Sequence, residues 1–358
     1  MLLSLRTVCY LSALADHFSH KLEGLWDLQR DSVNVGPEYF GHYSTHIFTK
    51  EAEEIVRRHD RNKPLFLYLA YSANHEPVAV PPEYEKQYMF IDDPERRTLA
   101  GMTSCVDEGI GNLTETMRKH GLLENTVIVL TSDNGGDTDF GGNNWPLKGK
   151  KATLWDGGVR VPAFVNSPLL HDNVRGTKYK GLMHITDWFP TLLHLAGGTS
   201  PSKKLDGVNQ WKSISEGAPS KRKDALLNIN TLNSVLVTHD PKPFSDNPYF
   251  DIRIQSAIRE GIWKLMTGKT GNTHWIVPPE SQDVKLPEEE ETELHNVHLY
   301  DIAEDPGEVH NLALQRPDVV MRLLKRLADY YETYVPPQTQ TEPQINFREM
   351  GDFWHPWV

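Results

Sequence analysis

The chain has 358 residues, of which 38% are hydrophobic and 24% charged. This length and composition allow about two domains with real hydrophobic cores and exclude a disordered chain. Lys and Arg number 37 against 49 Asp and Glu, a net charge of −12, so we expect no nucleic-acid partner. Cys9 and Cys105 are too few for a disulfide framework, and Cys105 is expected to be buried. No apolar run of about 18 residues occurs, so no membrane span is predicted.

The first part of the chain alternates between helical and strand patterns. Residues 49–59 are predicted as a helix capped by Thr49. The apolar run 64–71 is typical of a strand buried on both faces of a parallel sheet. Helical spacing over 94–121 precedes a second buried strand at 126–131. The order strand, helix, strand predicts a crossover unit with parallel strands.

The middle and last parts of the chain predict two domains. A glycine-rich loop at 134–150 is followed by a third strand at 161–165 and a helix at 186–196. The residue pattern then changes. Residues 255–266 predict an antiparallel hairpin, and residues 317–334 predict a last amphipathic helix. The acidic stretch 278–293 is expected to be a solvated loop. We therefore predict a larger α/β domain over 1–235 and a smaller C-terminal domain over 236–358, with an antiparallel sheet and a helix.

Polar residues follow two of the predicted strands at the point where each strand ends. His75 comes shortly after the run 64–71, and Asp133 and Asn134 come directly after 126–131. Ligands of open parallel sheets collect at the carboxyl ends of the strands. Asp133 and Asn134 offer the hard oxygen ligands that Ca²⁺ prefers, but Asp-Asn-Gly-Gly is also a good turn sequence. His75 alone fits a surface or core position as well as a catalytic one.

A lysine-rich loop follows and completes a set of ordered motifs. Lys148, Lys150 and Lys151 lie among glycines, where they either hold an oxyanion or form a solvated loop. Together the motifs resemble the sulfatase family and, within it, the arylsulfatase B (N-acetylgalactosamine-4-sulfatase) type. The motifs are His-Glu-Pro at 75–77, Asp-Asn-Gly-Gly at 133–136, Gly-Gly-Asn-Asn-Trp-Pro-Leu-Lys-Gly-Lys-Lys at 141–151, Trp-Asp-Gly-Gly-Val-Arg-Val-Pro at 155–162, His-Ile-Thr-Asp-Trp-Phe-Pro at 184–190, and Leu-Tyr-Asp-Ile with Asp-Pro-Gly-Glu at 299–308.

The resemblance implies a fold, an activity and a set of site residues. It implies an α/β fold, with an alkaline-phosphatase-like sheet sandwiched by helices whose N-terminal part is missing, plus a smaller C-terminal α+β domain. It implies hydrolysis of sulfuric esters of sugars, such as glycosaminoglycans, or of aryl sulfates, with one calcium ion. The site residues it implies are His75 and Lys151 as catalytic groups, Asp133 and Asn134 as calcium ligands, and Lys148 and Trp145 as substrate contacts.

The resemblance also implies a lysosomal or secreted glycoprotein. The sequon at Asn112, Asn-Leu-Thr, agrees with this location. Residues 1–15 lack the basic region and the continuous apolar stretch of a convincing signal peptide.

The sequence departs from the family in its first third. Sulfatases of this kind use a formylglycine made within Cys (or Ser)-x-Pro-x-Arg, and none of the 24 prolines here has Cys or Ser two positions earlier. The early Asp pair, which holds half of the calcium ligands, and the Gly-Lys-Trp-His segment are also missing. We therefore expect this polypeptide alone to fold poorly and to show no turnover. Three hypotheses stay open: an arylsulfatase, an inactive remnant or sulfated-glycan-binding protein, and a related metal-dependent phosphoesterase.

Overall fold

The computed structural model describes residues 8–10, 14–31, 33–200, 204–233, 244–271, 274–278, 281, 284–286, 296–336 and 354. The chain divides into two compact units, which are described separately below. The first unit comprises 1–126, 139–142 and 339–358, and the second unit comprises 127–138 and 143–338. The predicted domain boundary between 235 and 236 lies outside the described residues and stays a prediction. No described helix is both long enough and apolar enough to cross a membrane.

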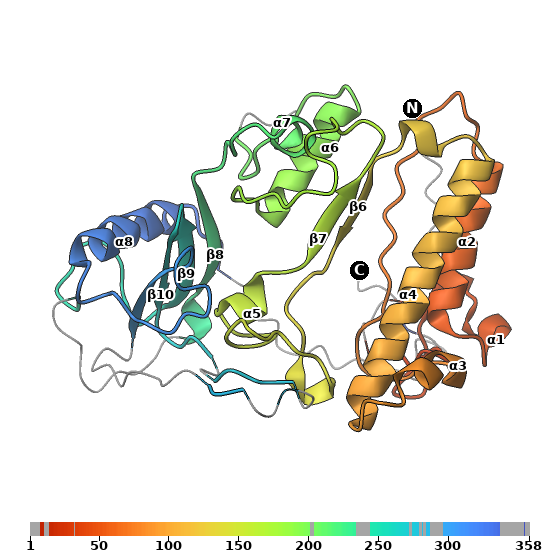
Figure 1. Ribbon diagram of the computed structural model, residues 1–358, viewed down its shortest axis with the longest axis horizontal. Helices are drawn as coiled ribbons and strands as arrows, with labels where there is room; N and C mark the ends of the chain where they lie inside the picture. Colours follow the sequence, from red (N-terminus) through yellow and green to blue (C-terminus); the bar gives the residue numbers. More distant parts are fainter. Residues whose placement is uncertain are drawn as a thin grey trace. The chain divides into compact units, whose positions relative to one another are not determined.

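Two long helices dominate the first unit (Figure 1). Helix α4 (Pro94–Lys119) confirms the predicted helix, and the Asp93 carboxylate caps it by accepting the N–H of Arg96 at 2.9 Å. Helix α2 (Ser44–Arg58) begins five residues before the predicted start. The prediction that Thr49 caps this helix was therefore wrong. The Thr49 hydroxyl instead donates to the carbonyl of residue 45 at 2.8 Å, within the helix.

The apolar run 64–71 is extended but forms no strand ladder among the described residues. From Phe66 to Tyr71, exposed and half-buried side chains alternate with a period of two, as in a strand. Leu69 and Tyr71 pack against the core cluster at α2, whereas Phe66 is 64% and Tyr68 82% exposed. The prediction of burial on both faces was wrong, because one face packs on the helices and the other is open.

The smaller elements of the first unit are short antiparallel strands and single helical turns. The strands β1 (Val8–Tyr10), β4 (Leu28–Arg30) and β5 (Val33–Asn34) form one sheet, and β2 (Lys21–Leu22) pairs with β3 (Leu25–Trp26). The helical turns are α1 (Gly36–Tyr39), α3 (Pro82–Glu85), η1 (Lys86–Tyr88) and η2 (Leu123–Asn125). The turn η3 (Thr138–Phe140) contains residues of both units.

The second unit begins with a two-stranded ribbon. Strand β6 (Ile128–Thr131) pairs with β7 (Ala163–Asn166), and the pairing is antiparallel. Both strands were predicted, but the described residues do not contain the expected parallel pairing of the second strand with 64–71. The loop between β6 and β7 contains the short helix α5 (Asp156–Val159). Beyond β7 follow η4 (Ile185–Asp187), α6 (Trp188–Leu195) and α7 (Trp211–Glu216).

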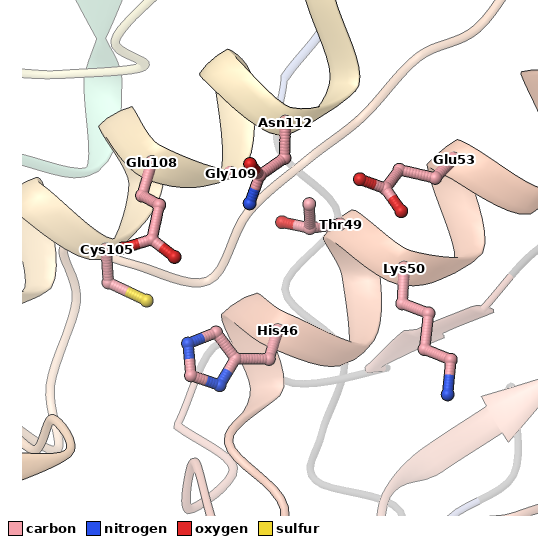
Figure 2. A pocket seen from close by; sticks show the side chains of 8 residues that line it. All are labelled: His46, Thr49, Lys50, Glu53, Cys105, Glu108, Gly109 and Asn112. Atoms are coloured by element: carbon pink, nitrogen blue, oxygen red, sulfur yellow. The ribbon is translucent and has the colours of Figure 1, made fainter. Parts of the chain in front are cut away.

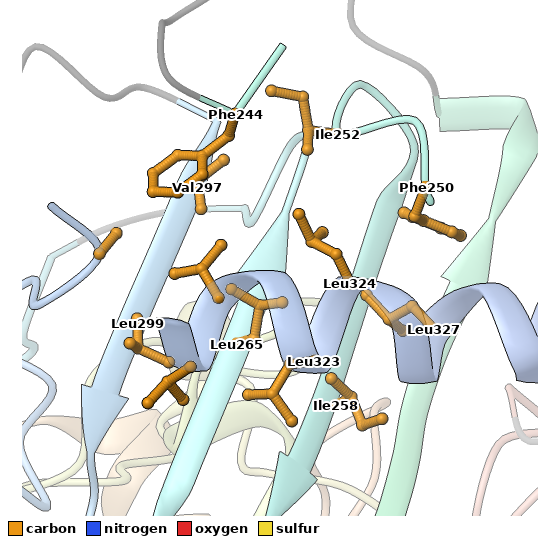
Figure 3. Close-up of a cluster of buried hydrophobic side chains, with 13 residues drawn as sticks. Phe244, Phe250, Ile252, Ile258, Leu265, Val297, Leu299, Leu323, Leu324 and Leu327 are labelled. Carbon is orange, nitrogen blue, oxygen red and sulfur yellow. The ribbon is translucent and has the colours of Figure 1, made fainter. Parts of the chain in front are cut away.

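The second unit ends in a four-stranded antiparallel sheet with the order β11-β10-β9-β8. Its strands are β8 (Asp224–Asn230), β9 (Gln255–Glu260), β10 (Trp263–Thr267) and β11 (Val297–Asp301), and η5 (Thr231–Asn233) follows β8. The pairing of β9 with β10 confirms the predicted hairpin. Helix α8 (Pro317–Tyr331) confirms the predicted last helix. Its residues Leu323, Leu324 and Leu327 face the sheet and form the core with Ile258 and Leu265 (Figure 3).

Candidate functional site

The turn after β6 places Asp133 and Asn134 at the end of the strand. The Ser132 N–H donates to the carbonyl of Pro162 at 3.1 Å, which fixes the start of the turn against the chain that leads into β7. Asp133 Oδ1 accepts the N–H of Asn134 at 2.8 Å, and the Asn134 side-chain amide donates to the carbonyl of Gly135 at 3.1 Å. The motif therefore has the bonds of a polar turn, and it also keeps the Asp133 carboxylate exposed.

Main-chain hydrogen bonds join this turn to the lysine-rich loop. The Lys151 N–H donates to the carbonyl of Gly136 at 3.2 Å. The Asn144 side chain accepts the N–H of Gly136 at 2.8 Å and donates back to its carbonyl at 2.9 Å. The Gly135 N–H donates to the carbonyl of Gly158 at 2.9 Å. The structure thus brings the predicted ligand turn and the predicted anion-binding loop together in one unit.

Two glycines are required for this close approach. A Cβ atom on Gly135 would lie 1.8 Å from the carbonyl oxygen of Gly157, and one on Gly158 would lie 2.5 Å from the carbonyl oxygen of Lys150. Any larger residue at 135 would therefore push the turn away from α5, and one at 158 would push α5 away from the lysine-rich loop.

The three lysines of the loop have different surroundings. Lys148 is only 5% exposed, and its Nζ lies 4.2 Å from the ring centroid of Trp155 and 4.4 Å from that of Trp275. Lys150 Nζ lies 3.4 Å from Asp137 Oδ1 in an ion pair. Lys151 is half-buried. Trp275 belongs to none of the motifs, so sequence reasoning missed it. The two aromatic rings hold Lys148 as a fixed part of the loop wall.

Trp145, the other predicted substrate contact, lies at the start of the same loop. Its N–H donates to Asn143 Oδ1 at 2.9 Å, and the Asn143 amide donates to the carbonyl of Ile276 at 3.1 Å. Trp145 is half-buried. Its predicted contact with substrate, like that of Lys148, stays a prediction.

His75 belongs to the first unit, where a second histidine holds its turn. His75 Nδ1 lies 2.9 Å from the carbonyl oxygen of Glu76. The fully buried His17 donates from Nε2 to the carbonyl of His75 at 3.3 Å and accepts from the Ser44 hydroxyl at Nδ1, at 2.7 Å. Burial lowers the pKa of His17, which favours this neutral tautomer. Asp133, Asn134 and Lys151 belong to the second unit. That His75 shares one site with them therefore stays a prediction.

The first unit also contains a small polar cavity between α2 and α4 (Figure 2). It has a volume of about 170 Å³, and Cys105, Glu108 and Asn112 of α4 face His46 and Glu53 of α2 across it. Cys105 is 1% exposed, as predicted, and burial raises the pKa of its thiol to about 11. A thiol with this pKa stays protonated and unreactive at neutral pH.

The residues present do not fit a complete calcium site. Asp133 and Asn134 have the right donor chemistry, but Ca²⁺ takes about 6–8 oxygen ligands. Nowhere in the described ranges do three or more His, Cys, Asp or Glu side chains gather in a group able to hold a metal. The predicted role of Asp133 and Asn134 as calcium ligands stays a prediction, and no chemical step follows from a metal here.

Known proteins show the same sequence pattern. The sulfatase family profile matches residues 5–198, more than half of the chain. Arylsulfatase J of Mus musculus is 40% identical over 88% of this chain and 54% of its own length. N-acetylgalactosamine-6-sulfatase of Homo sapiens is 32% identical over 84% of this chain and 54% of its own length. The chain thus spans about half the length of these curated relatives.

The fold agrees with this match. The crystal structure of Ps i-CgsB superposes with a TM-score of 0.64 and 26% sequence identity, over 85% of this chain and 57% of that one. The solved structures that match this chain confirm the α/β sulfatase fold class that the sequence predicted. On its sequence and its fold, the chain belongs to the sulfatase family.

Proposed function

We propose that this chain carries the sulfate-binding part of a sulfuric ester hydrolase of the arylsulfatase B type, which acts on sulfated sugars or aryl sulfates. The observation that carries the proposal is the hydrogen bond from the Lys151 N–H to the carbonyl of Gly136 at 3.2 Å. It joins the loop that offers a cation to the turn that offers oxygen ligands. The similarity to an N-acetylgalactosamine-6-sulfatase supports a sulfated sugar as the substrate class.

We propose that the sulfate group binds to Lys151. The chain carries a net charge of −12, so an anionic ester needs a local cation to bind. Lys148 is buried between two tryptophan rings and Lys150 pairs with Asp137. Lys151 is the loop lysine that also bonds to the ligand turn through its backbone. We assign its ammonium to the sulfate oxygens, with Lys148 and Trp145 forming the wall of the same loop.

His75, Asp133 and Asn134 complete the proposal. Because His75 Nδ1 bonds to the carbonyl of Glu76, Nε2 is the nitrogen from which the protonated ring would donate to the leaving ester oxygen. Asp133 and Asn134 would supply two of the oxygen ligands of a calcium ion, which in sulfatases neutralises sulfate charge when bound.

Turnover needs a nucleophile that these 358 residues do not provide, since the sequence contains no Cys (or Ser)-x-Pro-x-Arg. We therefore propose that the chain by itself binds the ester without hydrolysing it. The second candidate function, a protein that binds sulfated glycans without catalysis, predicts the same binding. The two differ in whether a longer product with the missing motif exists.

The test is calorimetric titration of the purified chain with a chromogenic aryl sulfate. We expect binding by the wild type, its loss in Lys151→Ala, and no release of the chromophore. Lys325→Ala on α8 is the matched control, because it removes the same charge from an exposed position of the same unit. Equal binding by Lys151→Ala and the control would overturn the proposed site. Release of the chromophore would overturn the proposed lack of turnover.

We also propose a lysosomal or secreted glycoprotein. The support is the exposed position of Asn112 on α4, where an oligosaccharide can be attached without disturbing a core.

A further inference from the structure

A buried ion cluster lies next to the lysine-rich loop. Lys264 Nζ on β10 lies 2.7 Å from Asp156 Oδ1 and 2.7 Å from Glu308 Oε1. The side chains of Lys264 and Glu308 are 0% exposed and that of Asp156 is 4% exposed. Apolar residues of similar volume often serve stability as well as such a cluster does. The cluster therefore calls for an explanation other than stability.

Asp156 connects this cluster to both halves of the proposed site. Its main-chain N–H donates to Glu308 Oε2 at 2.7 Å. The next residue, Gly157, donates its N–H to the carbonyl of Lys148 at 2.7 Å, and the carbonyl of Gly158 accepts the N–H of Gly135 at 2.9 Å. Three consecutive residues thus bond to the cluster, to the lysine-rich loop and to the ligand turn.

A second connection between Glu308 and the lysine-rich loop runs through Trp275, one of the two tryptophans whose rings contact Lys148. Trp275 Nε1 donates to the carbonyl of Gly307, directly before Glu308, at 3.0 Å. Glu308 itself has a φ of 56°, a left-handed backbone that is uncommon for a non-glycine residue. Such backbone strain persists only where the surroundings fix it, and it occurs often near functional sites.

We infer that Lys264 and Glu308 are positioning residues of the proposed sulfate ester site, and that they act through Asp156, Gly157 and Gly158. They hold the lysine-rich loop and the Asp133–Asn134 turn in one fixed arrangement. This assignment rests on the proposed function. It extends the proposed site to Lys264, which lies 108 residues beyond Asp156 in the sequence.

The cluster has an excess of negative charge. Two carboxylates share one ammonium, and Asp156 Oδ2 is buried without a hydrogen-bond partner among the described residues, with Arg160 Nη1 3.8 Å away. Burial raises the pKa of Glu308 to about 6, although Lys264 opposes the shift. The charged and titratable groups around Glu308 are Lys264 on β10, Asp156 at the start of α5, and Asp305 and His310 in its own turn. Arg160, directly after α5, and Arg259 on β9 act on Asp156.

The experiment measures the dissociation constant of an aryl sulfate for the full chain between about pH 5 and pH 7.5. Above pH 6 the deprotonated Glu308 repels the Asp156 carboxylate and loosens the arrangement that the cluster holds, so wild-type affinity is expected to fall about threefold or more as the pH rises. Glu308→Gln keeps the shape of the side chain and should remove this slope. Lys264→Met should weaken binding by about tenfold or more at every pH.

Asp187→Asn is the matched control, because it makes the same change of carboxylate to amide in another buried ion pair of the second unit. It should lower stability and leave both the affinity and its pH profile as in the wild type. Because histidines titrate in the same pH range, the slope is assigned to Glu308 only if Glu308→Gln removes it.

The outcomes separate this inference from the proposed function. If the wild type binds the ester and Lys151→Ala does not, the proposed function holds. A wild-type pH slope retained in Glu308→Gln, together with unchanged affinity in folded Lys264→Met, would then overturn the positioning roles alone. If Lys264→Met does not fold, the pH dependence of affinity in Glu308→Gln alone decides whether the positioning roles hold. A wild-type chain that binds no ester overturns the proposed function and this inference together.

Discussion

The main-chain N–H of Lys151 lies 3.2 Å from the carbonyl oxygen of Gly136 and donates to it. This bond ties the lysine assigned to the sulfate group to the turn that contains Asp133 and Asn134. Gly135 and Gly158 let the turn and the lysine-rich loop each pack closely against α5.

Lys148 should contribute to stability more than its charged neighbour Lys150 does. Its ammonium lies over the rings of Trp155 and Trp275. Lys148→Ala is therefore expected to lower the free energy of unfolding by about 2 kcal/mol. Lys150→Ala, which removes an ion pair with Asp137, should cost about 1 kcal/mol or less. Urea denaturation of both variants measures the difference, and equal losses would contradict the assigned role of Lys148.

The ion pair of Asp187 and Arg222 should make the second unit sensitive to acid. Arg222 Nε donates to Asp187 Oδ1 at 3.0 Å and to Oδ2 at 2.8 Å, and Asp187 is fully buried. Burial opposes ionisation of Asp187, but hydrogen bonds from Arg222 and Val208 outweigh it and hold the pKa of Asp187 below its ordinary value. The stability from this pair is therefore present above the ordinary pKa and is lost as the pH falls through the lowered one.

Asp187→Asn is expected to lower the free energy of unfolding by about 3–5 kcal/mol at pH 7, because it leaves Arg222 buried without a counter-charge. Denaturation curves at pH 7 and pH 3 test this, and the gap between wild type and variant should narrow at the lower pH. A gap of constant size at both pH values would show that the charge of Asp187 does not contribute.

Calcium should bind weakly to this chain. Asp133 and Asn134 supply two side-chain oxygens, whereas the ion takes about 6–8 ligands. Titration with CaCl₂ is expected to show no saturation below about 1 mM, and Asp133→Asn should leave the curve unchanged. Saturable micromolar binding that Asp133→Asn abolishes would show that other residues complete the site.

Asn112 should carry an oligosaccharide when the chain passes through the secretory pathway. Its side chain is exposed on α4, and Thr114 completes the sequon. Treatment with an N-glycosidase should reduce the mass of the expressed protein. Asn112→Gln and Thr114→Ala should abolish this difference, while Thr114→Ser should retain it. A glycan that persists in Asn112→Gln would place the modification elsewhere.

Apolar periodicity in the sequence predicted those helices and strands that pack a single face against a core. Helix α4, helix α8 and the hairpin of β9 and β10 follow from apolar periodicity, because each packs one face against a core. The run 64–71 shows the limit of such reasoning. Its composition predicts an extended chain, but the burial of each face depends on neighbouring segments that periodicity does not specify.

Candidate site residues could be singled out from the sequence only where they stand together in motifs. Asp133, Asn134 and Lys151 could be singled out because they follow a strand and lie among glycines. Trp275, Lys264 and Glu308 could not be, since they reach the loop by contacts between distant parts of the chain. A buried lysine within a strand looks like any other polar position of an alternating pattern.

A crystal structure of the chain soaked with an aryl sulfate ester would show whether Lys151 binds the sulfate group. We expect a sulfate oxygen about 2.7–3.2 Å from Lys151 Nζ, beside the turn of Asp133 and Asn134. An ester bound elsewhere, for example in the cavity between α2 and α4, with Lys151 untouched, would contradict this expectation.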